Sequence, residues 1–235
     1  MKEYLLIGAG GTGGLFIGPA LIYLNAHHTN HGEEWHFTVV DGDAYEETNL
    51  VRQFFDPRYL GSNKANAVAE EYTRYPITPI PEFVGYPKLR ELMSEGIVVF
   101  IGADNHSLRA EVEKRALELQ NCIVINAGNE YHDGSVQLWV REGGENKTPR
   151  LSYGHAEIAY TGANDRSFMS CMEITQLPSG EQLIIANMAA AQHMLAALWR
   201  YHNNLWIEGW TELQFDLMLA QVDHINMRER RNWAT

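Results

Sequence analysis

The sequence predicts an α/β fold in which helices cover both faces of a mostly parallel sheet. Short apolar runs alternate with helical patterns from the N-terminus as far as Asn126, as in parallel strands joined by crossover helices. A glycine-rich segment, Gly8–Gly14, directly follows the first apolar run. After Asn126 the pattern changes to alternating and loop-like segments, which indicates antiparallel strands. We therefore expect a Rossmann-like sheet that is extended by C-terminal antiparallel strands.

The first predicted strand and helix enclose the glycine-rich turn. The apolar run predicts a strand over Glu3–Ile7, and the next apolar segment predicts a helix over Gly13–Asn25. Glycine permits a tight turn and lets the backbone approach a phosphate closely, and a helix N-terminus offers free N–H donors. The spacing of Gly8, Gly10 and Gly13 therefore predicts a nucleotide-phosphate site.

The other elements of the parallel half follow from the same patterns. The polar stretch His27–Glu34 is expected to be a loop inserted before the second strand. Further strands are expected over His36–Val40, Ile77–Val84, Ile97–Ile101 and Cys122–Asn126, and further helices over Gly61–Arg74 and Asn105–Gln120.

The C-terminal part is predicted to be less regular. An antiparallel strand over Ser135–Arg141 is expected to follow an Asp-Gly turn at 133–134. Residues 142–180 are polar and weakly periodic, which predicts a long loop. A helix is expected over Leu183–Tyr201 and a late strand over Glu212–Leu219. We expect one domain over residues 1–235, with a core at 1–141, a loop at 142–182 and a terminal helix and strand at 183–235.

Composition excludes several classes of protein. The 235 residues carry a formal net charge of −12, which argues against non-specific nucleic-acid binding. No apolar stretch is long enough for a membrane span and no signal peptide precedes the first strand, so we expect a cytoplasmic protein. The two cysteines, Cys122 and Cys171, form no CxxC pair, so no zinc site is expected.

Four charged positions favour a nucleotide ligand with a triphosphate. Asp41 ends the second predicted strand, where an acid holds a ribose hydroxyl in dinucleotide-binding folds. Arg52 and Lys64 follow it, and such cations suit phosphate oxygens. Asp104 lies at the carboxyl end of the fourth predicted strand, where ligands bind in open α/β sheets. A carboxylate at that place can hold magnesium.

Five motifs in this order resemble the ThiF/MoeB family, bacterial relatives of ubiquitin-activating enzymes. They are Gly8–Gly13, Asp41 with Asp43, Asn49–Gln53, Gly61–Lys64 and Asp104-Asn105. The resemblance covers residues 3–141 and, more loosely, 170–201. The short chain is most similar to compact ThiF proteins of the PRTRC type. Ordered co-occurrence of several motifs is far more specific than any one of them.

The resemblance implies an ATP-dependent adenylyltransferase that uses ATP and magnesium. Its implied substrate is the C-terminal carboxylate of a ubiquitin-like or sulfur-carrier protein ending in Gly-Gly. The family is dimeric, so a homodimer is expected. The implied site comprises Gly8, Gly10, Gly11 and Gly13 against the nucleotide, Asp41 on the ribose, Asn49, Arg52 and Lys64 on the phosphates, and Asp104 on magnesium. Asp43 and Gln53 belong to it by pattern alone.

Two alternatives stay open at this point. A thiol in the family often captures the activated acyl group, so Cys171 is a candidate nucleophile, although a lone cysteine is usually inert; Cys122 is expected in the core. The whole chain could instead be a non-catalytic or NAD(P)-binding Rossmann protein that recruits a partner. Relatives often supply an arginine from a helix before the first strand. Here either the site works with fewer cations or another segment supplies the charge, and the candidates are Arg150, Arg166, Arg228, Arg230 and Arg231.

Overall fold

The computed structural model describes residues 1–130, 132–153, 155, 158, 184–206 and 210–226. They form one nine-stranded sheet ordered β3-β2-β1-β4-β5-β6-β8-β9, with β7 paired to β6. The strands are β1 Lys2–Ile7, β2 Trp35–Val40, β3 Ile77–Ile80, β4 Val98–Ile101, β5 Cys122–Asn129, β6 Asp133–Glu142, β7 Glu145–Asn146, β8 Trp210–Asp216 and β9 Gln221–Asn226. The helices are α1 Gly11–His31, α2 Lys64–Glu71, α3 Tyr86–Leu92, α4 His106–Leu117 and α6 Ile184–His202, with short 3-10 turns at Glu47–Asn49 and Pro57–Tyr59.

The first five strands are parallel, as predicted. β1 pairs with both β2 and β4, β3 lies outside β2, and β5 lies outside β4. The strand order therefore reverses between β1 and β4, which creates a topological switch point at the carboxyl ends of these two strands. Ligands bind at such a point in open α/β sheets.

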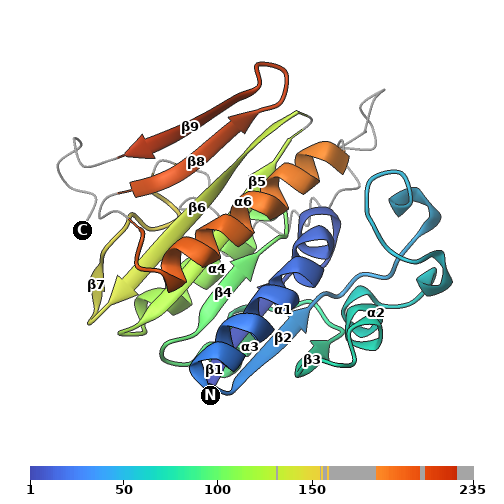
Figure 1. The fold of residues 1–235 in the computed structure, drawn as a ribbon, viewed down its shortest axis with the longest axis horizontal. Coiled ribbons are helices and arrows are strands. Elements are labelled where there is room, and N and C mark those ends of the chain that lie inside the picture. The colour runs from blue at the N-terminus through green and yellow to red at the C-terminus, as the bar shows by residue number, and fades with distance from the viewer. Residues whose placement is uncertain (131, 154, 156–157, 159–183, 207–209, 227–235) are drawn as a thin grey trace.

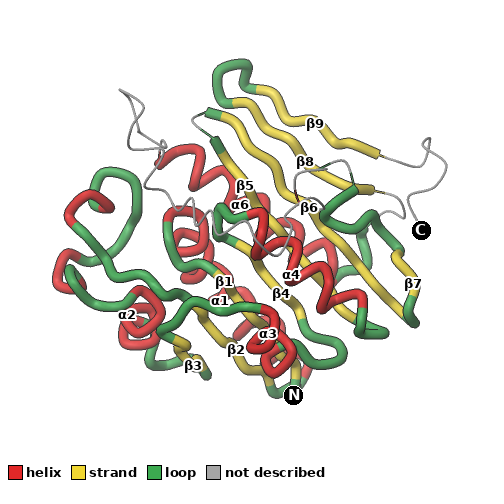
Figure 2. Tube along the Cα trace, turned by 180° about the vertical axis from the view of Figure 1, so that it is seen from behind, coloured by secondary structure: helices red, strands yellow, loops and turns green. Residues whose placement is uncertain are grey.

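Helices cover both faces of the sheet, which confirms the predicted layers. Helices α1, α2 and α6 pack apolar residues on one face, around Phe37 and Phe100. Helices α3 and α4 cover the other face, around Val99 and Trp139. Figure 1 shows α1 and α6 side by side on the near face, and Figure 2 shows α3 and α4 on the opposite face. Burial on both faces explains why β4 reads as an uninterrupted apolar run.

The antiparallel half is larger than the sequence predicts. β6 pairs antiparallel with β5 and β8, and β8 pairs with β9. Asp133 and Gly134 belong to strand β6 and not to a turn, because Gly134 pairs with Asn129. The predicted strand Glu212–Leu219 ends at Asp216, whose carboxylate accepts the N–H groups of Met218 and Leu219 and closes a turn into β9.

The stretch His27–Glu34 is not a loop, because helix α1 continues to His31. Gly32 ends the helix with a left-handed φ of 65°, the conformation that glycine adopts at helix C-termini. His28 is buried and its Nε2 lies 2.7 Å from the hydroxyl of Tyr4. The polar side chains of this stretch therefore include one that packs inside the protein.

Two further elements, α2 and β3, are shorter than predicted, and one helix, α3, was not predicted. The predicted helix over Gly61–Arg74 is only Lys64–Glu71, because the side chain of Asn63 caps it by accepting the N–H of Asn66. The predicted strand Ile77–Val84 ends at Ile80, where its pairing with β2 also ends at Val40. Helix α3 begins after Gly85 with a proline in its first turn, a signal that the sequence analysis did not use.

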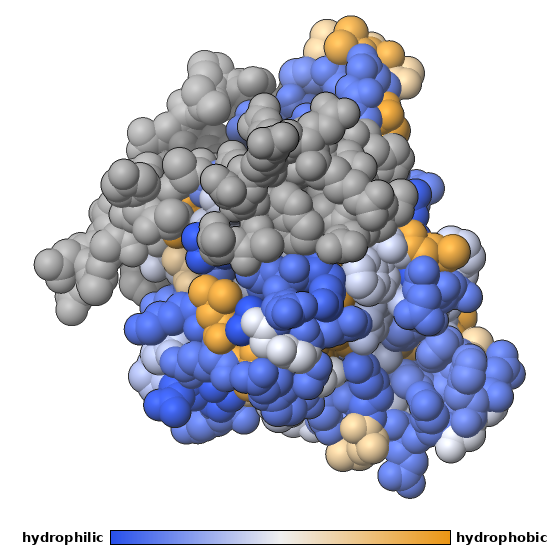
Figure 3. All heavy atoms as spheres, turned by 90° about the vertical axis from the view of Figure 1, so that its left-hand side faces the viewer, coloured by the Kyte–Doolittle hydropathy of each residue, from blue (hydrophilic) through white to orange (hydrophobic). Residues whose placement is uncertain are grey.

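One face of the described part of the molecule is mostly polar. Figure 3 shows one side of the molecule, where hydrophilic residues dominate and apolar residues form separate small patches. Among the described helices, none has both the length and the apolar character that crossing a membrane requires.

Candidate functional site

Two adjoining cavities open at the carboxyl edge of the sheet. The first, of about 190 Å³, lies at the switch point and is lined by the turn after β1; we call it the glycine-loop cavity. The second, of about 650 Å³, lies over the polar face of β6, β8 and β9; we call it the acidic chamber. Asp104, Gly128 and Asn129 line both, so the two spaces share a wall.

The glycine turn is shaped by close backbone contacts. Gly8 has a φ of 94°, which favours glycine. A Cβ on Gly13 would lie 1.9 Å from the carbonyl oxygen of Gly8, and one on Gly11 would lie 2.5 Å from Nδ2 of Asn187. No side chain caps the start of α1 at Gly10, and its first turn carries no acid. The N–H groups and the positive end of the helix dipole therefore suit an anion in the cavity.

Asp41 holds this turn in place. Its Oδ2 accepts the N–H of Ala9 at 2.6 Å, and its Oδ1 accepts the N–H of Asp43 at 2.9 Å. Burial raises the pKa of Asp41, whereas the nearby Lys64 cation and these two N–H groups lower it. Asp41 lines the cavity, and its contact with a ribose remains a prediction.

Lys64 places a buried cation at the cavity. The cap at Asn63 makes Lys64 the first residue of α2, and only 6% of it is exposed. Its Nζ lies 3.5 Å from Oδ2 of Asp43, which is half-exposed. A buried lysine beside a solvent-reachable carboxylate can exchange that partner for a phosphate oxygen.

The segment around Arg52 reaches the cavity through two of its three expected residues. Arg52 and Gln53 line it, and Oε1 of the buried Gln53 has no hydrogen-bond partner among the described residues. Such a buried acceptor suits a donor from a ligand. Asn49 does not line the cavity, because its side chain accepts the N–H of Glu46 and closes a local capping box.

Asp104 ends β4 between the two cavities. Its carboxylate is half-exposed and lies 3.6 Å from Nη2 of Arg109. Magnesium keeps several waters and takes phosphate oxygens, so one protein carboxylate is enough to fit it. The described residues contain no cluster of three or more His, Cys, Asp or Glu side chains that could bind a metal alone.

One residue that the sequence did not predict, Asn187, connects the glycine turn, the end of β5 and the segment of Arg52. Asn187 of α6 is 1% exposed. Its Oδ1 accepts from Oγ1 of Thr12 at 3.2 Å and from Nδ2 of Asn129 at 3.1 Å, and its Nδ2 donates to the carbonyl oxygen of Arg52. A lone asparagine in the apolar run before Ala189 was the available signal, because a buried amide needs partners.

Several other predicted residues either lie outside the described part of the chain or line neither cavity. Cys171 is outside the described residues, as are Arg166, Arg228, Arg230 and Arg231. Arg150 is described and lies 3.7 Å from Glu113; it lines neither cavity. Cys122 is buried, and burial raises the pKa of its thiol to about 12, which places it in the core as expected.

Comparisons with known proteins agree with this architecture. A sequence model of the ThiF family matches residues 2–233, while no curated protein matches the sequence. Two similar solved structures are those of E. coli MccB with ATP, at 17% identity and a TM-score of 0.66, and of MccB with MccA-N7isoASN, at 17% and 0.67. Each covers 96% of the chain but only 63% and 64% of MccB, respectively. A structure of PaaA is similar at 14% identity and a TM-score of 0.63, covering 97% of the chain and 73% of PaaA. These likenesses show the fold.

Proposed function

The chain belongs to the ThiF family, and we propose on that premise that it is an ATP-dependent adenylyltransferase that activates the C-terminal carboxylate of a partner protein. The observation that carries the proposal is the glycine-loop cavity. It gathers Arg52, Lys64 and Asp104 beside an uncapped helix N-terminus. An NAD(P)-binding protein has no comparable need for these two cations and a carboxylate.

The proposed nucleotide lies with its phosphates at the start of α1. The N–H groups of the Gly10–Gly13 turn and the Lys64 ammonium would bind phosphate oxygens. The unpartnered Oε1 of Gln53 suits a ligand donor such as a ribose hydroxyl. Magnesium bound with ATP would neutralise phosphate charge, and Asp104 would hold it.

The proposed reaction needs positioning and charge stabilisation more than proton transfer. An oxygen of the partner's carboxylate forms a bond to the α-phosphorus, and the bond from that phosphorus to the oxygen of the β-phosphate breaks. Pyrophosphate leaves and an acyl-adenylate remains. Because the carboxylate is already ionised at neutral pH, no general base is required. Arg52 and Lys64 would stabilise the charge that develops in the transition state.

The proposed partner is a ubiquitin-like or sulfur-carrier protein whose flexible tail ends in Gly-Gly. Support comes from the space beside the nucleotide, since the acidic chamber meets the glycine-loop cavity at Asp104 and can admit an extended chain. MccB has been crystallised with MccA, so a fold of this kind can accommodate a peptide. We further propose that the chain acts as a single adenylation domain, as a homodimer and in the cytoplasm.

Two measurements test the proposal. Calorimetry should show binding of ATP with magnesium and no useful affinity for NAD. ATP–pyrophosphate exchange should then depend on adding a carrier protein that ends in Gly-Gly, and a carrier whose C-terminus is amidated should give none. Tight NAD binding without ATP binding would overturn the proposal.

A further inference from the structure

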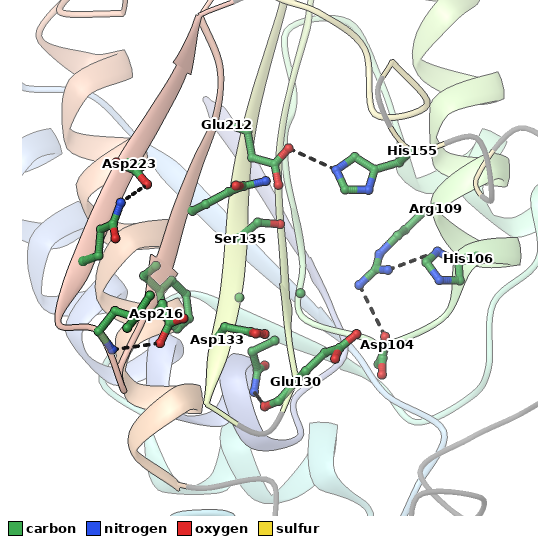
Figure 4. A pocket seen from close by; sticks show the side chains of 17 residues that line it. Asp104, His106, Arg109, Glu130, Asp133, Ser135, His155, Glu212, Asp216 and Asp223 are labelled. Carbon is green, nitrogen blue, oxygen red and sulfur yellow. Dashed lines mark hydrogen bonds and ion pairs between the residues drawn. The ribbon is translucent and has the colours of Figure 1, made fainter.

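Arg109 of α4 is a buried cation beside the wall that the two cavities share. Only 5% of it is exposed, and it is the one lysine or arginine among the described residues that line the acidic chamber. Its Nη2 lies 3.6 Å from Oδ1 of Asp104, which lines both cavities. Figure 4 shows its guanidinium directed at Asp104 and His106. A buried arginine normally has a partner, and here the partner is the carboxylate that is proposed to hold magnesium.

Hydrogen bonds to the sheet fix the guanidinium of Arg109 in place. Its Nε donates to Oδ1 of Asn126 at 3.1 Å, and its Nη2 donates to the carbonyl oxygen of Ala127 at 3.3 Å. Asn126 is buried as well, and its Nδ2 donates to Oε1 of Gln137 at 2.8 Å. These partners belong to β5 and β6, whereas Asp104 follows β4 and its side chain is half-exposed. The fixed cation therefore sets the position of the carboxylate, and not the reverse.

Without this cation, the carboxylate of Asp104 would oppose an anionic ligand. Asp104 lines the cavity that also contains the uncapped start of α1, where the phosphates are proposed to lie. Two unit charges about 4 Å apart interact strongly enough, even in water, to change an affinity about fivefold, and more strongly near a protein surface. The same negative charge would attract a divalent metal ion. Pairing with Arg109 therefore lowers both the repulsion of free phosphate and the attraction of magnesium.

We propose that Arg109 is a positioning residue of the nucleotide site, which holds Asp104 at the shared wall and offsets its charge. The inference rests on the proposed function, because it concerns the nucleotide and the metal of that function. Arg109 lines the acidic chamber and lies outside the described lining of the glycine-loop cavity, so it acts on the nucleotide through Asp104. With the pair intact, the cavity accepts phosphates before a metal ion is bound.

The test compares ATP binding with and without magnesium. Calorimetry with the full chain gives one dissociation constant for ATP in EDTA and another for ATP in excess magnesium chloride, and the ratio of the first to the second measures how far the metal improves binding. In Arg109→Gln the carboxylate of Asp104 is no longer offset and opposes free ATP more than magnesium-bound ATP, so the ratio should rise at least about fivefold. A variant that only loosens the fold would weaken both kinds of binding and leave the ratio unchanged.

Three further variants test whether the effect runs through the pair. Arg109→Lys keeps a cation and should restore most of the natural ratio. Asp104→Asn has no carboxylate to offset, so adding Arg109→Gln to it should not raise the ratio further. Asn126→Ala removes the acceptor of Nε but keeps the guanidinium, and Asn126 lies outside the described lining of both cavities. It should raise the ratio by a smaller factor, and it carries the test if Arg109→Gln does not fold.

Arg115→Gln is the matched control on the same helix. The side chain of Arg115 is only 14% exposed, and its Nη2 donates to the carbonyl oxygen of Met93 at 2.7 Å, but it lies outside the described lining of both cavities, so the ratio should stay natural.

The outcomes separate this inference from the proposed function. An unchanged ratio in Arg109→Gln and Asn126→Ala, or an equal rise when Arg109→Gln is added to Asp104→Asn, would overturn the inference. If the ratio changes as expected but no ATP–pyrophosphate exchange occurs with the carrier, the proposed function is wrong and the role of Arg109 stands. Exchange with an unchanged ratio would do the reverse, and a natural chain that binds no ATP would overturn both.

Discussion

Asn187 in helix α6 donates a 3.1 Å hydrogen bond to the main-chain carbonyl of Arg52, 135 residues earlier in the chain. The amide oxygen of the same side chain accepts hydrogen bonds from the hydroxyl of Thr12 and from Nδ2 of Asn129. One buried side chain thus fixes the segment that carries the Arg52 guanidinium against the glycine turn. The late helix is therefore part of the candidate site and does more than cover the sheet.

Replacing Asn187 by leucine should lower both stability and nucleotide affinity. The change removes an amide of similar size and leaves the carbonyl of Arg52 without its bond, at about 1–3 kcal/mol for a buried unsatisfied group. The hydroxyl of Thr12 keeps its bond to Oδ1 of Asn129. Urea unfolding and ATP calorimetry measure the two effects. Asn203→Ala is the matched control, because its Nδ2 also donates to a main-chain carbonyl but is exposed. A stability loss equal in both variants would show that Asn187 has no special position.

Neutralising Lys64 should abolish adenylation without unfolding the protein. Lys64→Met keeps the apolar stem but removes the buried ammonium, and loss of one such transition-state charge typically costs about 10²–10³ in rate. Lys88→Met is the control, since Lys88 of α3 forms its ion pairs among the described residues with the exposed acids Glu82 and Glu91. Pyrophosphate exchange with the carrier is the measurement. Normal exchange in Lys64→Met would remove Lys64 from the proposed machinery.

Asp104→Asn should raise the magnesium concentration needed for half-maximal exchange. The amide keeps the shape of the side chain but loses the charge that would attract the metal. Asp56→Asn, on the exposed turn before Pro57, serves as the control because its carboxylate lies outside both cavities. The measurement is the magnesium concentration at half-maximal pyrophosphate exchange in each variant. An unchanged midpoint in Asp104→Asn would count against a role in holding the metal.

Elements and site residues could be predicted from the sequence where neighbouring residues alone determine them. The parallel strands and the glycine turn are local patterns, and the residues alone predict their order, although β3 is shorter than predicted. Arg52 and Lys64, which follow β2, line the glycine-loop cavity, and their roles remain predictions. The sequence did not predict strand β9, because a short polar strand forms mainly through pairing with distant segments. Helix α3 was also not predicted, although the glycine and the proline at its start are a local signal. Asn187 and Arg109 gave only weak signals, since a buried polar residue is recognised by its partners, which the chain order does not reveal. The histidine-rich end of α1 looked like a loop because its apolar environment comes from β1 and α6.

Gly13→Ala should destabilise the fold severely. The added Cβ would lie 1.9 Å from the carbonyl oxygen of Gly8, and backbone atoms cannot move aside as a flexible side chain can. Overpacking of this kind costs typically about 1–3 kcal/mol and can cost more. Gly85→Ala is the control, because Gly85 has an ordinary φ of −115° and a Cβ there would make only ordinary van der Waals contact, 3.7 Å from Oε2 of Glu111. A smaller loss of about 1 kcal/mol or less is expected, since alanine is a poorer N-cap than glycine. Thermal unfolding of the two variants measures the difference, and similar melting temperatures would contradict the contact.

Acid should destabilise the protein through His202. Burial, together with the charges of His27, His28 and Lys2, lowers the pKa of His202 to about 3, whereas an unfolded histidine titrates near about 6.5. Between these values the unfolded chain binds more protons than the folded one, so the free energy of unfolding falls as the pH drops below about 6.5. Its neighbours at the C-terminal end of α1 add to the effect, because burial also lowers the pKa values of His27 and His28.

A histidine variant separates this cause from general acid sensitivity. His202→Gln cannot take up a proton and retains a polar group for the hydroxyls of Tyr4 and Tyr23, which lie 3.1 and 3.0 Å from the two ring nitrogens. Urea unfolding at pH 7 and pH 5 should therefore show a smaller loss of stability in His202→Gln than in the natural chain. His36→Gln, at a partly exposed position on β2, should keep the natural loss. If His202→Gln loses as much stability on acidification as the natural chain, the buried imidazole is not the group that responds.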